Sequence, residues 1–180
     1  KLRNALQLTE LIRKDPRVMG VAPTLSSQVF YNYGPVQLNG TISGVDIMEE
    51  DKLFDLRSKM KSGRLEDLQA NTDGIIMGTG LARKLNVETG DRVVITTPEG
   101  YTMTLKIVGT FQMGIGLVDN IRSYANISMV QIILQKDQSY ITDINITKSR
   151  SGQMVNGSTF RSDVNASGAI NITDINLVKS

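Results

Sequence analysis

Residues 74–111 read GIIMGTGLARKLNVETGDRVVITTPEGYTMTLKIVGTF and carry the clearest structural pattern in the chain. The first part predicts a short apolar strand at 74–77, followed by a helix of one to two turns at 80–86. Alternating apolar residues then stand on both sides of the turn at 98–100, which predicts a β-hairpin over 92–111. A strand, a glycine turn, a short helix and a hairpin in this order indicate a mainly β unit.

The flanking sequence adds helices on both sides of this unit. Short strands rich in β-branched and aromatic residues are predicted at 18–21, 28–33 and 36–45. Helices, marked mainly by apolar residues at three- and four-residue steps, are predicted at 2–14, 49–61 and 127–134. Helices that flank a run of strands predict an α+β fold.

The composition excludes several classes of function. The chain has 180 residues, of which 40% are apolar and 21% charged, and its net charge is +2. Because the basic residues are scattered along the sequence, we expect no nucleic-acid partner. The chain has no cysteine and no histidine, so thiolate and imidazole chemistry are both excluded. The apolar runs are too short for a membrane-spanning helix.

Glycines and acidic pairs in this sequence invite functional interpretations that the spacing does not favour. Gly78 and Gly80 could form a phosphate-binding turn, but the GxGxxG spacing is absent and no Lys-Ser/Thr follows. We therefore interpret them as a structural turn. The acidic runs at 49–51 and 66–67 are interpreted as solvated faces or caps of helices. The basic strip from Arg57 to Arg64 is interpreted as a solvated face that could also contact lipid headgroups.

An ordered series of residues resembles the extracytoplasmic domain of ABC-transporter permeases of the MacB and lipoprotein-release type. In that family a glycine strand, a G-x-x-L-A-x-x-L helix, a G-D turn and a G-x-F strand follow one another. The matching residues here are Gly74, Gly78, Leu81, Ala82, Leu85, Gly90, Asp91, Val108, Gly109 and Phe111. Weaker matches from the N-terminus to about Asp143 are Gly20-Val21 with Pro23, Gly44-Val45-Asp46 with Glu49, Gly63, Gly114, Asp119 and Val130-Gln131.

This resemblance implies a porter-like α+β part at 1–138 with an inserted, mostly β subdomain at about 70–125. In the family the domain stands between two transmembrane helices on the periplasmic side of the inner membrane, so the full-length protein is expected to be membrane-tethered. A cytoplasmic ATPase subunit, a second permease copy and a protein or lipoprotein substrate are the implied partners. No catalytic residue is implied. The helix and strand that complete the porter part in the family are not recognisable in this sequence.

A second pattern begins after about Gln138, where Ser, Asn, Thr and Asp become frequent. Residues 163–174, DVNASGAINITD, resemble the calcium loop of a dockerin, an EF-hand-like loop that binds Ca²⁺ through oxygen ligands with glycine at its sixth position. Gly168 stands at that position. The predicted ligands are Asp163, Asn165, Ser167, the carbonyl of Ala169, Asn171 and Asp174. The sequence therefore predicts a short dockerin-like segment at 139–180.

An internal repeat leaves one part of this segment open. Residues 141–149 read ITDINITKS and residues 172–180 read ITDINLVKS, so seven of nine positions recur. A first calcium loop before 141–149 is absent, because apolar and basic residues occupy its ligand positions. The segment 141–149 fits either a strand of the permease family or the exit helix of a dockerin loop.

Three functions are compatible with these patterns. The leading hypothesis is a non-catalytic permease domain that handles lipoproteins, peptides or amphiphiles and transmits motion. The alternative is a dockerin-type module that binds a cell-surface receptor when calcium is present. A hydrolase that uses Asp or Ser is the weakest hypothesis, because no nucleophile and base are recognisable as a pair.

Overall fold

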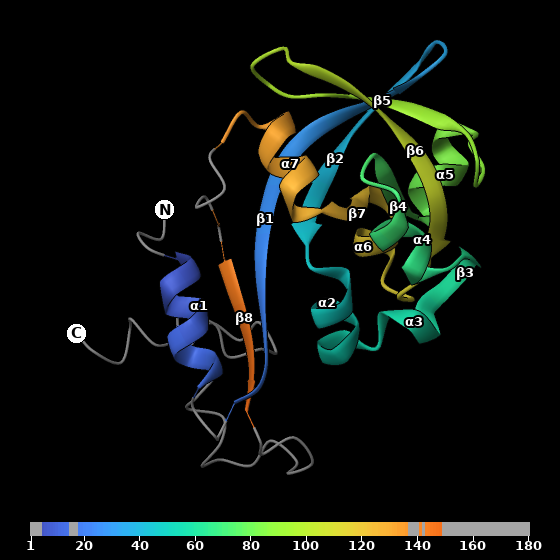
Figure 1. The fold of residues 1–180 in the computed structure, drawn as a ribbon. Helices are drawn as coiled ribbons and strands as arrows, with labels where there is room; N and C mark the ends of the chain where they lie inside the picture. The colour runs from blue at the N-terminus through green and yellow to red at the C-terminus, as the bar shows by residue number, and fades with distance from the viewer. Residues whose placement is uncertain (1–4, 15–17, 137–140, 142, 149–180) are drawn as a thin grey trace.

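The computed structural model describes residues 5–14, 18–136, 141 and 143–148 (Figure 1). Within them the helices are α1 (Ala5–Arg13), α2 (Ile47–Phe54), α3 (Leu56–Lys59), α4 (Leu65–Ala70), α5 (Thr79–Leu85), α6 (Gly116–Ile121) and α7 (Ile127–Ile133). The strands are β1 (Val18–Tyr33), β2 (Val36–Val45), β3 (Met60–Gly63), β4 (Gly74–Gly78), β5 (Arg92–Thr96), β6 (Thr102–Phe111), β7 (Arg122–Asn126) and β8 (Asp143–Lys148). The predicted α+β class is confirmed.

Six of the described strands close into a small barrel. The pairing runs β1–β2–β7–β4–β6–β5 and returns from β5 to β1. The β2–β7 and β4–β6 pairs are parallel, and the other four are antiparallel. The predicted hairpin is confirmed as β5 and β6. The mostly β part predicted at about 70–125 supplies four of these strands, and the other two are β2 and the part of β1 from Thr24 onward.

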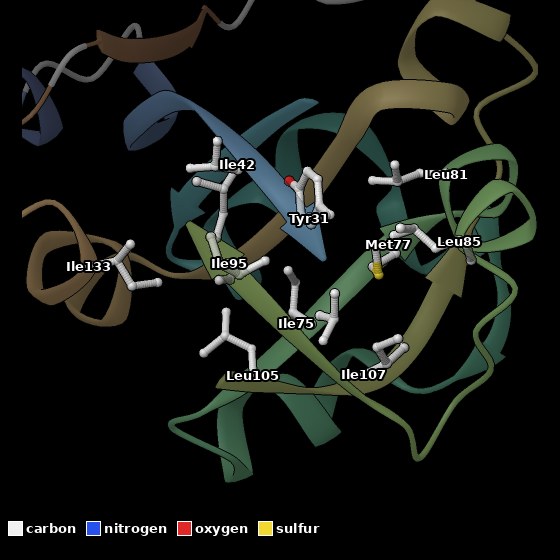
Figure 2. Close-up of a cluster of buried hydrophobic side chains, with 14 of the residues drawn as sticks. Tyr31, Ile42, Ile75, Met77, Leu81, Leu85, Ile95, Leu105, Ile107 and Ile133 are labelled. Atoms are coloured by element: carbon white, nitrogen blue, oxygen red, sulfur yellow. The ribbon is translucent and has the colours of Figure 1, made fainter. Parts of the chain in front are cut away.

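The barrel interior holds the larger apolar core. Side chains from β1, β2, β4, β5 and β6 point toward one another there, with α5 and α7 at its margins (Figure 2). Tyr31, Ile75 and Ile95 in this cluster are fully buried. Ile76 points to the opposite face and belongs to a second cluster, as the alternation along a strand requires. That second cluster includes residues of α2, α3 and α4, which cover the outside of the barrel.

The lower end of β1 belongs to a different part of the molecule. It extends beyond the barrel, where β8 pairs with it and α1 lies close by (Figure 1). Thr24 marks the changeover, because it pairs with Val45 of β2 on one side and with Asp143 of β8 on the other. One continuous strand therefore joins the α1–β8 part to the barrel.

The structure corrects three expectations. The predicted strands at 18–21 and 28–33 are one continuous strand, and Pro23 does not interrupt it. The pairing of β1 with β2 ends at Thr24, so Pro23 lies at an edge on that side, where the missing N–H of a proline is tolerated. The predicted helix at 49–61 ends at Phe54, since Asp55 is left-handed with φ 49°, and its last residues form β3. The exit-helix interpretation of 141–149 is wrong, because Asp143–Lys148 is a strand. The boundary near Gln138 stays a prediction.

A buried hydroxyl pair inside the barrel gives the first test. The Tyr31 and Ser123 hydroxyls lie 2.6 Å apart in a hydrogen bond, and both side chains are fully buried. We expect Tyr31→Phe to lower the free energy of unfolding by about 1–2 kcal/mol, because the Ser123 hydroxyl then loses this partner. The double variant Tyr31→Phe/Ser123→Ala should lose less than the sum of the two single variants. Urea denaturation of all four proteins measures this coupling, and strict additivity would contradict it.

Candidate functional site

The predicted calcium loop lies outside the described residues. This holds for all six predicted ligands, Asp163, Asn165, Ser167, Ala169, Asn171 and Asp174. Among the residues that the structure describes, no three acidic side chains come together in a group that could hold a metal ion. No described helix is long and apolar enough to cross a membrane. The calcium site therefore stays a prediction.

An exposed apolar loop follows β6. Residues 113–118 comprise the turn after β6 and the first three residues of α6, and we call this segment the apolar loop; its side chains Ile115 and Leu117 are 59% and 73% exposed. Large apolar side chains singly exposed on a surface are ordinary, but here two of them stand two residues apart on one loop. The apolar loop is therefore the strongest candidate for a contact surface in the described structure.

Buried Asp119 fixes the shape of the apolar loop. Its side chain is 7% exposed, and its two carboxylate oxygens accept hydrogen bonds from the N–H groups of Met113 at 2.7 Å and Gly114 at 3.0 Å. Gly114 has φ 82°, a conformation that favours glycine, so the loop can turn sharply at that point. The N–H groups of Val118 and Asp119 both donate to the carbonyl of Ile115 at 2.9 Å. The loop is thus held from inside by one carboxylate.

Three glycines on neighbouring elements allow residues 119–121 of α6, which follow the apolar loop, to pack closely against the barrel. A Cβ atom at Gly40 of β2, Gly78 of β4 or Gly80 of α5 would overlap atoms of residues 119–121. Side chains at these positions would therefore push α6 away from the barrel. Gly78 and Gly80 thus have a structural role at the glycine turn, because they allow the backbone of α6 to approach.

Arg57 and Lys59, both on α3, make different contacts. Arg57 forms ion pairs with Asp51 and Glu66, and its side chain is exposed, so the pairs contribute little stability. Lys59 lies beside the loop, because its carbonyl accepts a hydrogen bond from the N–H of Gln112 at 2.9 Å. The backbone of Lys59 therefore adjoins the residue that precedes the apolar loop.

An open groove lies near the glycine turn but lacks catalytic geometry. It has a volume of about 750 Å³, and its charged lining residues are Arg83, Glu88 and Asp91. The Asp91 carboxylate accepts a hydrogen bond from the N–H of Glu88 at 2.8 Å, so it stabilises the local turn. No nucleophile is placed beside a base among its lining residues, and we assign no reaction to it.

One buried acid contradicts the expectation that the acidic run at 49–51 is solvated. Glu50 is only 6% exposed, and its Oε2 atom has no hydrogen-bond partner among the described residues. It lies on the buried side of α2, near Arg122 and Tyr124 of β7. Burial raises the pKa of Glu50 to about 7, although the charge of Arg122 lowers it in part. Burial also raises the pKa of Tyr124, and the charge of Glu50 adds to this effect.

Comparison with known proteins identifies the family. The sequence model of the MacB-like periplasmic core domain matches residues 3–168. The chain belongs to this family. Its predicted location on the periplasmic face of the inner membrane is thereby confirmed. The match also extends past β8 and covers the first half of the predicted calcium loop, whose ligands it does not assign.

Curated relatives carry the name "Lipoprotein-releasing system transmembrane protein LolC". The protein of Neisseria meningitidis serogroup B is 31% identical over 146 residues, which is 76% of this chain and 34% of the relative. The protein of Xylella fastidiosa strain 9a5c is 29% identical over 139 residues, which is 71% of this chain and 33% of the relative. The chain therefore spans about a third of the length of these relatives.

Solved structures share the fold at low sequence identity. The periplasmic region of MacB from Actinobacillus actinomycetemcomitans matches with a TM-score of 0.60 and 16% identity, over 88% of this chain and 70% of that one. The extracellular domain of the transporter YknZ from Gram-positive bacteria matches with a TM-score of 0.61 and 11% identity, over 81% of this chain and 73% of that one. These likenesses support the MacB-like arrangement of the α+β fold.

Sequence reasoning missed the exposed pair at Ile115 and Leu117. The glycines at 114 and 116 indicated only a link between β6 and the next helix. A signal was present, because GIGL places two large apolar residues in a glycine-rich turn where neither helical nor strand periodicity buries them. Asp119 was noted as a family match, and the structure adds its hydrogen bonds to the loop.

Glu50 gives a prediction for the dependence of stability on pH. Its folded pKa, about 7, is raised above the ordinary value of 4.5, so the folded protein retains a proton that the unfolded chain has lost between these values. The contribution of this group to stability therefore falls as pH rises from about 4.5 through about 7, by about 3 kcal/mol in total.

We expect Glu50→Gln to be more stable than the wild type at pH 8 and equally stable at pH 4.5, because the amide carries no charge to desolvate. Denaturation curves at both pH values measure the difference. A gain of equal size at both would show that the charge of Glu50 is not its cause.

Proposed function

We propose that this chain is the non-catalytic extracytoplasmic domain of an ABC-transporter permease that exports or extracts lipoproteins, peptides or other amphiphiles. The observation that carries the proposal is membership of the MacB-like family over residues 3–168. The name of the LolC relatives favours a lipoprotein as the substrate. ATP hydrolysis then belongs to a separate cytoplasmic subunit, and a second permease copy completes the transporter.

The apolar loop is the part of the domain that we assign to substrate contact. An acylated or amphiphilic substrate needs apolar surface that is exposed before binding, and Ile115 and Leu117 provide it. The hydrogen bonds of the Asp119 carboxylate hold the apolar loop in one conformation before the substrate binds. The loop therefore loses less conformational entropy on binding than a flexible loop would lose. A cationic residue beside the loop, Lys59, suits an anionic headgroup or phosphate.

Variants of the loop test this assignment in the full-length permease, assembled with its ATPase in lipid vesicles. We expect Ile115→Ser/Leu117→Ser to lower the rate of substrate release at least about tenfold, because each side chain that becomes buried on contact contributes about 1.5–3 kcal/mol. Ile132→Ser is the matched control, since Ile132 on α7 is 58% exposed and lies away from the loop in the sequence. Equal release rates for the double variant and the control would contradict the assignment.

A calcium-dependent contact is the second candidate function. The pattern of oxygen-bearing residues at 163–174, with Gly168 at the sixth position, supports it. Only Asp163 and Asp174 among the six ligands carry charge, and the last ligand is Asp where the standard EF-hand has a bidentate Glu. Affinity rises with the number of charged ligands, so the loop should bind Ca²⁺ weakly.

We expect a dissociation constant of about 10⁻⁴ to 10⁻³ M for Ca²⁺. Calorimetric titration of the wild type beside Asp163→Ala measures it, because the substitution removes one of the two charged ligands. Equal heats from both proteins, or no heat at millimolar calcium, would leave 163–174 as an ordinary polar loop. The outcome has no bearing on the permease assignment, which rests on the family match.

A further inference from the structure

The sequence of strand β8 occurs twice in this chain. Residues 141–149 contain β8, and residues 172–180 repeat seven of their nine positions. The structure shows the place of the first copy, which pairs antiparallel with β1 from Asp143 opposite Thr24 to Lys148 opposite Val18. A second segment with nearly the same sequence is therefore a candidate for the same edge of β1.

The two positions at which the copies differ are compatible with that edge. Ile146 is replaced by Leu177, and its partner on β1 is Val21, which is 1% exposed. Thr147 is replaced by Val178, and its partner is Gly20. Both changes keep residues that suit a strand, and the second makes the segment more apolar. Neither change introduces a charge or a proline.

We propose that residues 18–24 of β1 form a strand-docking edge for which the C-terminal segment 174–179 of the same chain competes with β8. In the exchanged state Leu177 would stand opposite Val21 and Lys179 opposite Val18. β8 pairs with residues 18–24 of β1, and one edge of a strand takes one partner at a time, so the two copies exclude each other at the edge that β8 occupies. The exchange leaves the barrel pairings of β1 unchanged, because these begin at Thr24.

Loop lengths decide which copy holds the edge more often. From the end of α7 at Ile133, nine residues (134–142) lead to β8, and forty residues (134–173) would lead to the second copy. The probability that a flexible loop closes falls with the three-halves power of its length. Closure of the forty-residue loop is therefore roughly tenfold less probable than closure of the nine-residue loop. The first copy therefore holds the edge in most molecules. Exchange would also lengthen the connection between the barrel side and the α1–β8 part.

Engineered disulfides in the full 180-residue chain test this proposal cleanly, because the chain has no cysteine of its own. The test variant is Val21→Cys/Leu177→Cys, and the reference variant Val21→Cys/Ile146→Cys reports the first copy. The matched control is Val21→Cys/Val178→Cys, whose second side chain would point to the opposite face of the strand. Cross-linking is followed by mass spectrometry at low protein concentration. A chelator is present, because Asp174 is also the last predicted calcium ligand.

We expect the reference variant to cross-link fastest, the test variant about tenfold more slowly, as the loop lengths require, and the control variant at least about tenfold more slowly again. A rate for the test variant no higher than that of the control would overturn the proposal. Disulfides formed only between two molecules would overturn it as well, since the occupant would then not be the segment of the same chain. Failure of the reference variant to cross-link would show that β8 does not pair with β1 as the structure has it, and the proposal would fall with that pairing.

Discussion

The continuity of β1 is the constraint on which the arrangement of the described molecule depends. The strand is 16 residues long, and its upper end closes the barrel with β2 and β5 while its lower end pairs with β8. A break at Thr24 would separate two parts that share no other strand among the described residues. Hydrogen-bonded ladders on both sides of the changeover resist such a break. This continuity supports the hypothesis that the domain transmits motion as a rigid body.

Barrel closure in turn determines where a contact surface can form. Each barrel strand has a partner on both sides over at least part of its length, so the described barrel leaves only short stretches of free strand edge. Loops and helices at its ends or on its outside are therefore the larger part of the surface that a partner can contact. Glycines at 40, 78 and 80 allow α6 to approach the barrel closely, and α6 holds the apolar loop in place. The surface that we assign to substrate is therefore held close against the barrel.

Sequence patterns predicted the elements whose signals are local, and failed where pairing between distant strands decides the structure. The hairpin at 92–111 and the strand at 74–77 have clear alternation and turn residues, and both are confirmed. Residues 60–63 instead joined a predicted helix, because only their pairing with β6 makes them a strand. The burial of Glu50 was equally invisible, since three consecutive acids show no periodicity and the covering strand β7 is more than seventy residues away.

Four polar residues between positions 119 and 124, three of them buried and one (Arg122) exposed, have a common physical consequence. Asp119 binds the apolar loop, Ser123 bonds Tyr31 across the barrel, and Arg122 and Tyr124 lie near Glu50. All lie on or next to β7, a five-residue strand between β2 and β4. A slip of one residue would turn every side chain of so short a strand to the other face. Each buried polar partner would be lost in the slipped register, at a cost of about 1–3 kcal/mol per group. The unpaired Glu50 destabilises the fold at high pH, but its neighbours keep β7, and with it the apolar loop, in a single register.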